Sequence, residues 1–164
     1  MAENMTGTMT EKHKRLPGER QLAAWRIFLN THAAIIDRIE RDLATANRLP
    51  LGSYDVLVAL LEAPDHRLRM SELAQAVVLN RSTLTRRVDR LEQEGLLTRE
   101  RSGADRRGAY AVLTEQGRAA LREAWPIYAR GIENYFARHL SDEELATLTN
   151  ALGRLFAAAR QEEQ

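Results

Sequence analysis

Arginines gathered between residues 99 and 107, in the stretch "RERSGADRR", are the side chains of this chain best suited to bind a ligand. Guanidinium groups this close repel one another and are costly to bury unpaired, so packing in a core does not explain them. A polyanion would, because arginine forms strong charge-assisted hydrogen bonds with phosphate oxygens. Asp105 in the same stretch would repel nucleic acid unless it pairs with Arg107 and orients that guanidinium. We therefore expect a loop that contacts a polyanion.

A second cationic surface is predicted on a helix from Arg81 to Glu94. If Leu84, Val88 and Leu91 form the buried stripe of this helix, its opposite face is polar and mainly cationic. A solvated helix face without a ligand is the alternative interpretation, and this helix alone does not decide between the two. The side chains suited to contact phosphates or base edges are Arg81, Ser82, Thr83, Arg86 and Arg90.

Charge is unevenly distributed along the 164 residues, although the formal net charge is only +1. Residues 81–118 hold nine arginines and six carboxylates, whereas residues 139–164 hold two arginines and five carboxylates. The central segment is therefore basic and the end acidic, which is typical of a chain with one nucleic-acid-binding module.

Several functional classes are excluded or disfavoured by composition. The absence of cysteine excludes a thiol redox sensor, a cysteine-ligated zinc site and a cysteine nucleophile. The four histidines are too scattered for a local metal motif, and no nucleophile with a nearby base is evident. We expect no metal, no cofactor and no enzymatic activity.

The N-terminal residues 1–18 are polar and end in Pro-Gly, which predicts a flexible extension. They lack the apolar segment of a signal peptide, and no apolar run approaches the roughly 20 residues that span a bilayer. We therefore expect a cytoplasmic protein.

The remaining sequence predicts the elements that position the arginines. Apolar side chains recur at helical spacing over residues 19–47 and from Glu115 to His139, and Thr114 is a suitable N-cap for the second of these helices. Two short helices joined by a tight turn and followed by a hairpin are typical of a winged helix-turn-helix, a mainly α fold with a small β-hairpin wing (α+β). The expected elements between the long helices are a helix capped by Ser53, a strand at "HRLRM", a helix capped by Ser71, the helix from Arg81 closed by Gly95, and the strands "LLTRER" and "AYAVLT"; a last helix begins at Ser141.

The apolar stripes of the terminal helices, over residues 20–43 and 121–156, predict how the chain is organised. We expect them to pair with the same helices of a second chain, because one chain offers them few partners. A bundle within one chain is the alternative. The expected segments are a flexible extension over 1–18, an N-terminal dimerisation helix over 19–48, a winged helix-turn-helix DNA-binding lobe over 51–118 and C-terminal dimerisation helices over 119–160.

The stretches "MSELAQAVVLNRSTLTRRVDRLEQEGLLTRE" and "DRRGAYAVLTEQGRAAL" resemble the MarR (multiple antibiotic resistance regulator) family of dimeric winged-helix repressors. The resemblance implies a homodimer that binds a pseudo-palindromic, double-stranded DNA operator. It also implies that the helix from Arg81 to Glu94 enters the major groove. By the same resemblance, Asp105 and Arg107 reach the minor groove and Arg106 contacts the backbone.

Many members of this family bind small aromatic or phenolic acids between the dimerisation helices and the DNA-binding lobe, and then release DNA. Asp55, Arg87 and Arg99 match three residues of the urate-responsive members, whereas the ligand-contacting tryptophan of those members has no counterpart here. Core packing and an internal ion pair are the alternative roles, and a winged helix for protein contact or a constitutive DNA binder is the alternative function. The residues suited to a ligand site are Trp25, Phe28, His32, Tyr54, Asp55, Arg87 and Arg99.

Overall fold

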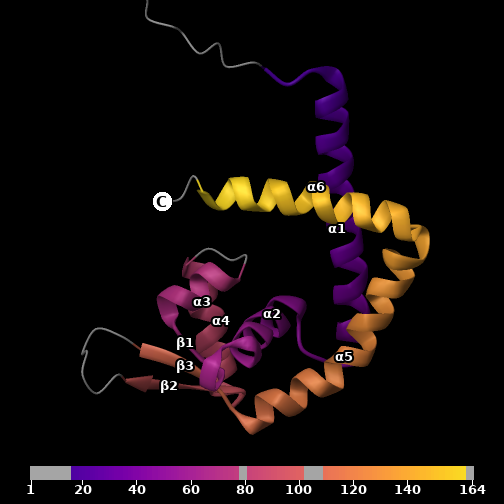
Figure 1. Cartoon of the computed structure of the whole chain (residues 1–164). Helices are drawn as coiled ribbons and strands as arrows, with labels where there is room; N and C mark the ends of the chain where they lie inside the picture. Colours follow the sequence, from indigo (N-terminus) through magenta and orange to yellow (C-terminus); the bar gives the residue numbers. More distant parts are fainter. Residues whose placement is uncertain (1–15, 78–80, 102–108, 162–164) are drawn as a thin grey trace, which may run out of the picture. The chain divides into compact units, whose positions relative to one another are not determined.

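Helices dominate the computed structural model, which describes residues 16–77, 81–101 and 109–161 (Figure 1). The described α-helices are α1 Glu19–Thr45, α2 Leu51–Glu62, α3 Met70–Ala76, α4 Arg81–Gln93, α5 Glu115–Tyr135 and α6 Asp142–Gln161. Short 3₁₀ turns cover Pro64–His66 and Ala137–His139, and the strands are β1 Arg67–Arg69, β2 Leu97–Arg101 and β3 Ala109–Leu113. The mainly helical fold class with a small sheet is confirmed.

The chain divides into two compact units, Met1–Ala33 and Ala34–Gln164. The first unit contains the N-terminal half of α1, and the second contains the rest of α1 and all other elements. Within the second unit, α1 packs closely on α5, since a Cβ added at Gly131 would lie 2.7 Å from Ile39 Cγ1. The hydroxyl of Tyr135 on α5 also donates a hydrogen bond of 2.9 Å to Asp42 on α1.

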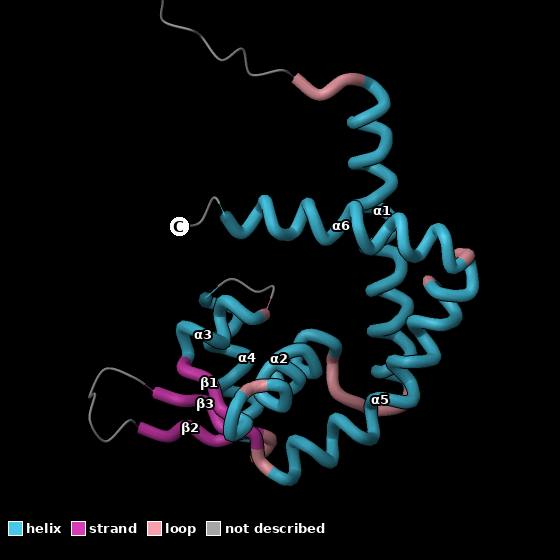
Figure 2. The backbone as a smooth tube through the Cα atoms, in the orientation of Figure 1, coloured by secondary structure: helices cyan, strands magenta, loops and turns pink. Residues whose placement is uncertain are grey.

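The three strands form one antiparallel sheet with the order β1-β3-β2, and Figure 2 shows them beside α2, α3 and α4. Leu97 of β2 lies opposite Leu113 of β3, and both are buried. Arg101 lies opposite Ala109 at the far end of the β2–β3 ladder. The hairpin predicted from "LLTRER" and "AYAVLT" is therefore present.

The core of the second unit is built from the C-terminal part of α1, helices α2 to α5 and the sheet. Leu84, Val88 and Leu91 of α4 are 2%, 0% and 0% exposed, so the predicted buried stripe of this helix is confirmed. Leu57 of α2 and Leu73 of α3 are fully buried in the same cluster. Burying this stripe fixes which side chains of α4 remain available on its opposite face.

The junction between α4, the hairpin and α5 follows the predicted signals. Gly95 adopts a φ of 72° just after α4, a conformation that glycine adopts without strain. Thr114 accepts a hydrogen bond of 3.0 Å from the N–H of Gly117 and donates one of 2.7 Å to the carbonyl of Gly95. Its side chain therefore caps α5 and ties that helix to the end of α4.

Two predicted helix starts were wrong. Helix α2 begins at Leu51 with Pro50 as the N-cap, and Ser53 lies inside the helix, 4% exposed. The N–H groups of Ser53 and Tyr54 donate to the carbonyl of Pro50. Because the helix begins at Leu51, these two N–H groups have hydrogen-bond acceptors, and Leu51 and Tyr54 are buried.

Helix α3 begins at Met70 rather than after Ser71. The backbone N–H of Arg69 donates to the carboxylate of Glu72 over 2.8 Å, so this acidic side chain closes the N-terminus without a serine cap. For α6, Ser141 and Glu144 bond reciprocally at the first turn, which confirms the predicted start.

Large apolar side chains remain exposed on the long terminal helices. Trp25 of α1, Trp125 of α5 and Leu155 of α6 are 56%, 53% and 66% exposed, respectively. Ile27, Phe28 and Phe156 are also exposed. Exposed apolar side chains in this number are typical of surfaces that bind another protein chain.

Candidate nucleic-acid interface

The face of α4 opposite its buried stripe gathers arginines. Arg86 and Arg90 are exposed, and Arg87 and Thr83 are half-buried beside them. These four side chains line a shallow hollow of about 220 Å³. Ser82 is exposed in the first turn, and Arg81 begins the helix, although its side chain lies outside the described residues.

Within the described residues, no carboxylate pairs with Arg86, whereas the Nε atom of Arg90 donates to Glu94 over 2.8 Å. Arg86 therefore offers an exposed guanidinium that no acid of the described residues engages. A surface with several arginines and few acids attracts phosphate oxygens, and a bidentate guanidinium also fits the edge of guanine.

The predicted wing residues Asp105, Arg106 and Arg107 lie outside the described residues. Strands β2 and β3, which precede and follow them, are described up to the Arg101 and Ala109 pair. The orienting role of Asp105 stays a prediction.

Arg99 connects strand β2 to α4. Its side chain donates to Asp89 over 2.5 Å and to Glu92 over 2.9 Å, and its backbone N–H donates to Glu92 over 3.1 Å. The side chain of Arg99 is 28% exposed, so these charge-assisted bonds are partly shielded from water. Arg99, predicted as a ligand residue, thus lies where it holds the hairpin against α4.

Arg87 extends from α4 toward α2, the direction that its position beside the buried stripe predicts. Its Nη1 atom donates to Ser53 Oγ over 3.3 Å, and a Cβ added at Gly52 would lie 3.0 Å from its guanidinium carbon. The glycine at position 52 therefore gives the guanidinium room against the first turn of α2.

Asp55 lies two residues after Ser53 on α2. Desolvation by the surrounding protein and repulsion by Glu40 raise the pKa of its carboxyl group, and attraction by Arg87 opposes them only in part. Arg87 thus acts on the Asp55 carboxyl group at a distance, and the internal pair or shared ligand site predicted from the sequence stays a prediction.

Tyr54 packs against aromatic residues of α5 that sequence reasoning did not assign to the site. Its ring lies edge-on to Tyr128 with 4.9 Å between centroids, and Trp125 lies 6.2 Å from Tyr128. Burial raises the pKa of both tyrosine hydroxyls, which stay protonated as hydrogen-bond donors. The spacing of Trp125 and Tyr128, three residues apart on one helix face, was the available signal.

The other predicted ligand residues lie in the Met1–Ala33 unit. Trp25 and Phe28 stack with 5.9 Å between ring centroids, and both are exposed. His32 follows on the same helix and is also exposed. The combination of these residues with Tyr54 and Arg87 in one site stays a prediction.

No side-chain group in residues 16–77, 81–101 and 109–161 has the composition of a metal site. Across the same described ranges, none of the helices is both long and apolar enough to cross a membrane.

Comparison with known proteins identifies the family. A family model described as "MarR family" matches residues 49–108. The transcriptional repressor YetL of Bacillus subtilis is 34% identical over 109 residues, which cover 64% of this chain and 62% of YetL.

Two solved structures from Streptomyces coelicolor are similar over most of this chain. AbsC, a MarR family transcriptional regulator, is 33% identical with a TM-score of 0.80, covering 90% of this chain and 99% of AbsC. Sco3205, solved in complex with DNA, is 30% identical with a TM-score of 0.81, covering 90% of this chain and 92% of Sco3205. The chain belongs to the MarR family of transcriptional regulators and is a DNA-binding regulator.

Proposed function

We propose that this protein is a cytoplasmic repressor that binds a pseudo-palindromic operator as a homodimer and is released by a small aromatic or phenolic acid. The observation that carries the proposal is the arginine surface of α4, with Arg86 exposed and without an acidic partner among the described residues. In this proposal α4 enters the major groove, and Asp105, Arg106 and Arg107 reach the adjacent minor groove and backbone.

Dimerisation is supported by the apolar side chains exposed on α1, α5 and α6, including Trp25, Trp125 and Leu155. A two-fold dimer presents two copies of α4 to successive major grooves, with half-site centres roughly 10 base pairs apart. Repression, rather than activation, is supported by the similarity to the repressor YetL.

Release by an aromatic acid is supported by the chemistry around Tyr54. Trp125 and Tyr128 offer aromatic surface, and Arg87 offers a cation for a carboxylate. The proposed site also includes Asp55 and, from the N-terminal unit, Trp25, Phe28 and His32. A ligand there releases DNA only if it binds the DNA-free conformation more tightly than the DNA-bound one.

DNA binding is tested by fluorescence anisotropy with a labelled duplex from the region upstream of the protein's own gene and with a scrambled duplex of equal length. We expect preference for the upstream duplex and a loss of about tenfold or more for Arg86→Ala. Arg41→Ala is the matched control, because Arg41 is an exposed arginine that pairs with Asp37 on α1. Equal affinity for both duplexes, or equal losses in both variants, would contradict operator recognition by α4.

Ligand release is tested by titrating salicylate into the protein and into its operator complex. We expect binding to the free protein, weaker operator binding, and loss of both effects in Arg87→Ala. If salicylate and related phenolic acids bind the free protein without changing operator affinity, the protein is a constitutive DNA binder.

A further inference from the structure

A cavity of about 250 Å³ lies between the α1–α2 turn, the end of α4 and α5, apart from the aromatic residues around Tyr54. We propose that it binds a small zwitterion, a ligand that carries one carboxylate and one ammonium group. The residues that line the cavity are Asn47, Arg48, Leu49, Pro50, Arg90, Glu94, Ala120 and Glu123.

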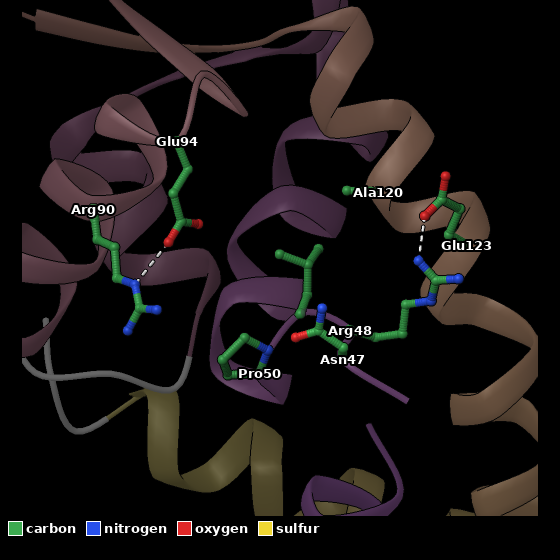
Figure 3. Close-up of a pocket in the computed structure, with 8 residues that line it drawn as sticks. Asn47, Arg48, Pro50, Arg90, Glu94, Ala120 and Glu123 are labelled. Carbon is green, nitrogen blue, oxygen red and sulfur yellow. Dashed lines mark hydrogen bonds and ion pairs between the residues drawn. The ribbon is translucent and has the colours of Figure 1, made fainter. Parts of the chain in front are cut away.

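Four charged side chains border this cavity in two ion pairs. Arg90 donates to Glu94 over 2.8 Å, and Arg48 donates to Glu123 over 2.5 Å. Figure 3 shows the two pairs on opposite sides of the pocket, with Asn47 and Pro50 between them. The cavity therefore presents two cations and two anions to whatever enters it.

This charge pattern selects the class of ligand. A simple anion bound by the remaining N–H donors of Arg48 or Arg90 would lie beside the glutamate that the arginine already pairs with, and the two negative charges would repel. A simple cation bound by one of the glutamates would lie beside an arginine and be repelled in the same way. A zwitterion pairs its carboxylate with arginine and its ammonium with glutamate, so every charge keeps a partner.

Breaking either ion pair to admit a ligand costs little because both pairs are accessible to water. The side chains of Arg48 and Glu123 are 40% and 57% exposed, and those of Arg90 and Glu94 are 70% and 40% exposed. Exposed pairs contribute little to stability, so a ligand can replace one at small cost. The volume lies below the roughly 300 Å³ typical of sites for drug-sized ligands, which favours a molecule the size of a free amino acid.

The walls of the cavity are already held in place. Asn47 adopts a φ of 52°, and the N–H of Arg48 donates to the carbonyl of Leu43 over 2.8 Å, which fixes the α1–α2 turn. On the opposite wall, Gln116 donates to the backbone carbonyl of Glu94 over 3.2 Å. A ligand therefore meets a preformed backbone and needs to reorient only side chains.

Arg90 gives this cavity a connection to DNA binding, a step that rests on the proposed function. The same side chain also lines the hollow on the arginine surface of α4. A carboxylate that holds Arg90 in the cavity removes one cation from that surface. We expect an occupied cavity to weaken operator binding.

The test is calorimetry of the full-length protein without DNA. The probes are β-alanine, γ-aminobutyrate and 6-aminohexanoate, whose charges are increasingly far apart, with butyrate and butylammonium as singly charged controls. We expect at least one zwitterion to bind about tenfold more tightly than either control. Arg48→Gln and Glu123→Gln should each weaken that binding by about tenfold, whereas the matched variant Arg41→Gln should not.

Failure to bind any of the zwitterions, or equal behaviour of Arg48→Gln and Arg41→Gln, would overturn the proposed site. Operator affinity is then measured with and without the bound zwitterion. Unchanged affinity would overturn the coupling through Arg90. Because the calorimetry contains no DNA, a failure of the zwitterion site is distinguishable from a failure of operator binding.

Discussion

The Nη2 atom of Arg99 on β2 lies 2.5 Å from Oδ1 of Asp89 on α4, and this bond joins the hairpin to the helix that we propose reads DNA. Glu92 accepts two further hydrogen bonds from Arg99. Since Asp89 and Glu92 lie almost one turn apart on α4, a single arginine bonds to two points of that helix and adds to the hold of its buried stripe.

Loss of this connection should affect both folding and DNA binding. We expect Arg99→Gln to lower the free energy of unfolding by about 1–2 kcal/mol, because it removes charge-assisted hydrogen bonds that are partly shielded from water. Urea denaturation measures this change, and anisotropy should show weaker operator binding. Arg122→Gln, which breaks a more exposed pair with Glu115, is the control and should change neither quantity. Equal stability of both variants would show that Arg99 does not hold the hairpin.

Gly117 is required by close packing at the start of α5. A Cβ at this position would lie 2.1 Å from the carbonyl oxygen of Leu96, too close for any small adjustment. We expect Gly117→Ala to lower the free energy of unfolding by about 2–3 kcal/mol. A Cβ added at Gly153 on α6 would meet no atom within 4 Å, so Gly153→Ala should stabilise the protein by about 0.5–1 kcal/mol. If Gly117→Ala and Gly153→Ala destabilise the protein equally, close packing against Leu96 is not the reason for glycine at position 117.

The proposed dimer should depend on the apolar side chains of the terminal helices. Leu155 on α6 is 66% exposed, and we expect Leu155→Glu to convert a dimer into a monomer at micromolar concentration. Light scattering measures the mass. Leu61→Glu on α2 is the control, because Leu61 is also exposed but lies outside the terminal helices. A wild-type protein that is monomeric and still binds its operator fully would contradict the dimer.

The helix and the wing should contribute differently to DNA binding. We expect Arg107→Ala to weaken binding to all duplexes and to reduce the salt slope by about 1, because a wing contact depends mainly on charge and groove shape. Arg86→Ala should in addition relax base preference, since we propose that α4 contacts base edges. Asp105→Ala should weaken binding although it removes a negative charge. Stronger binding by that variant would exclude the orienting role of Asp105.

The pH dependence of stability should report the surroundings of Asp55. Burial and repulsion by Glu40 raise the pKa of this carboxyl group in the folded protein, so folding favours its protonated form. Wild type therefore gains stability as the pH falls through the raised pKa toward the ordinary value of about 4, and loses it as the pH rises. We expect Asp55→Asn to be more stable than wild type at neutral pH, with the difference shrinking on acidification. A difference independent of pH would contradict this assignment.

Features that depend on neighbours along the chain could be predicted from the sequence. The spacing of Leu84, Val88 and Leu91 predicted the buried stripe of α4, and Thr114 and Ser141 predicted the starts of α5 and α6. These signals are readable because helical periodicity and caps involve residues three or four positions apart. The family resemblance, through its local motifs, was equally accessible.

Contacts between side chains far apart in the sequence were set by tertiary packing alone. Ser53, a plausible cap in the sequence, is buried and accepts a hydrogen bond from Arg87, 34 positions away. Arg48 meets Glu123 across 75 positions, and Tyr54 meets Tyr128 on another helix. The packing of apolar helix faces determines which polar side chains come close to one another. Polar groups that become buried in this way must form hydrogen bonds with whatever groups lie next to them.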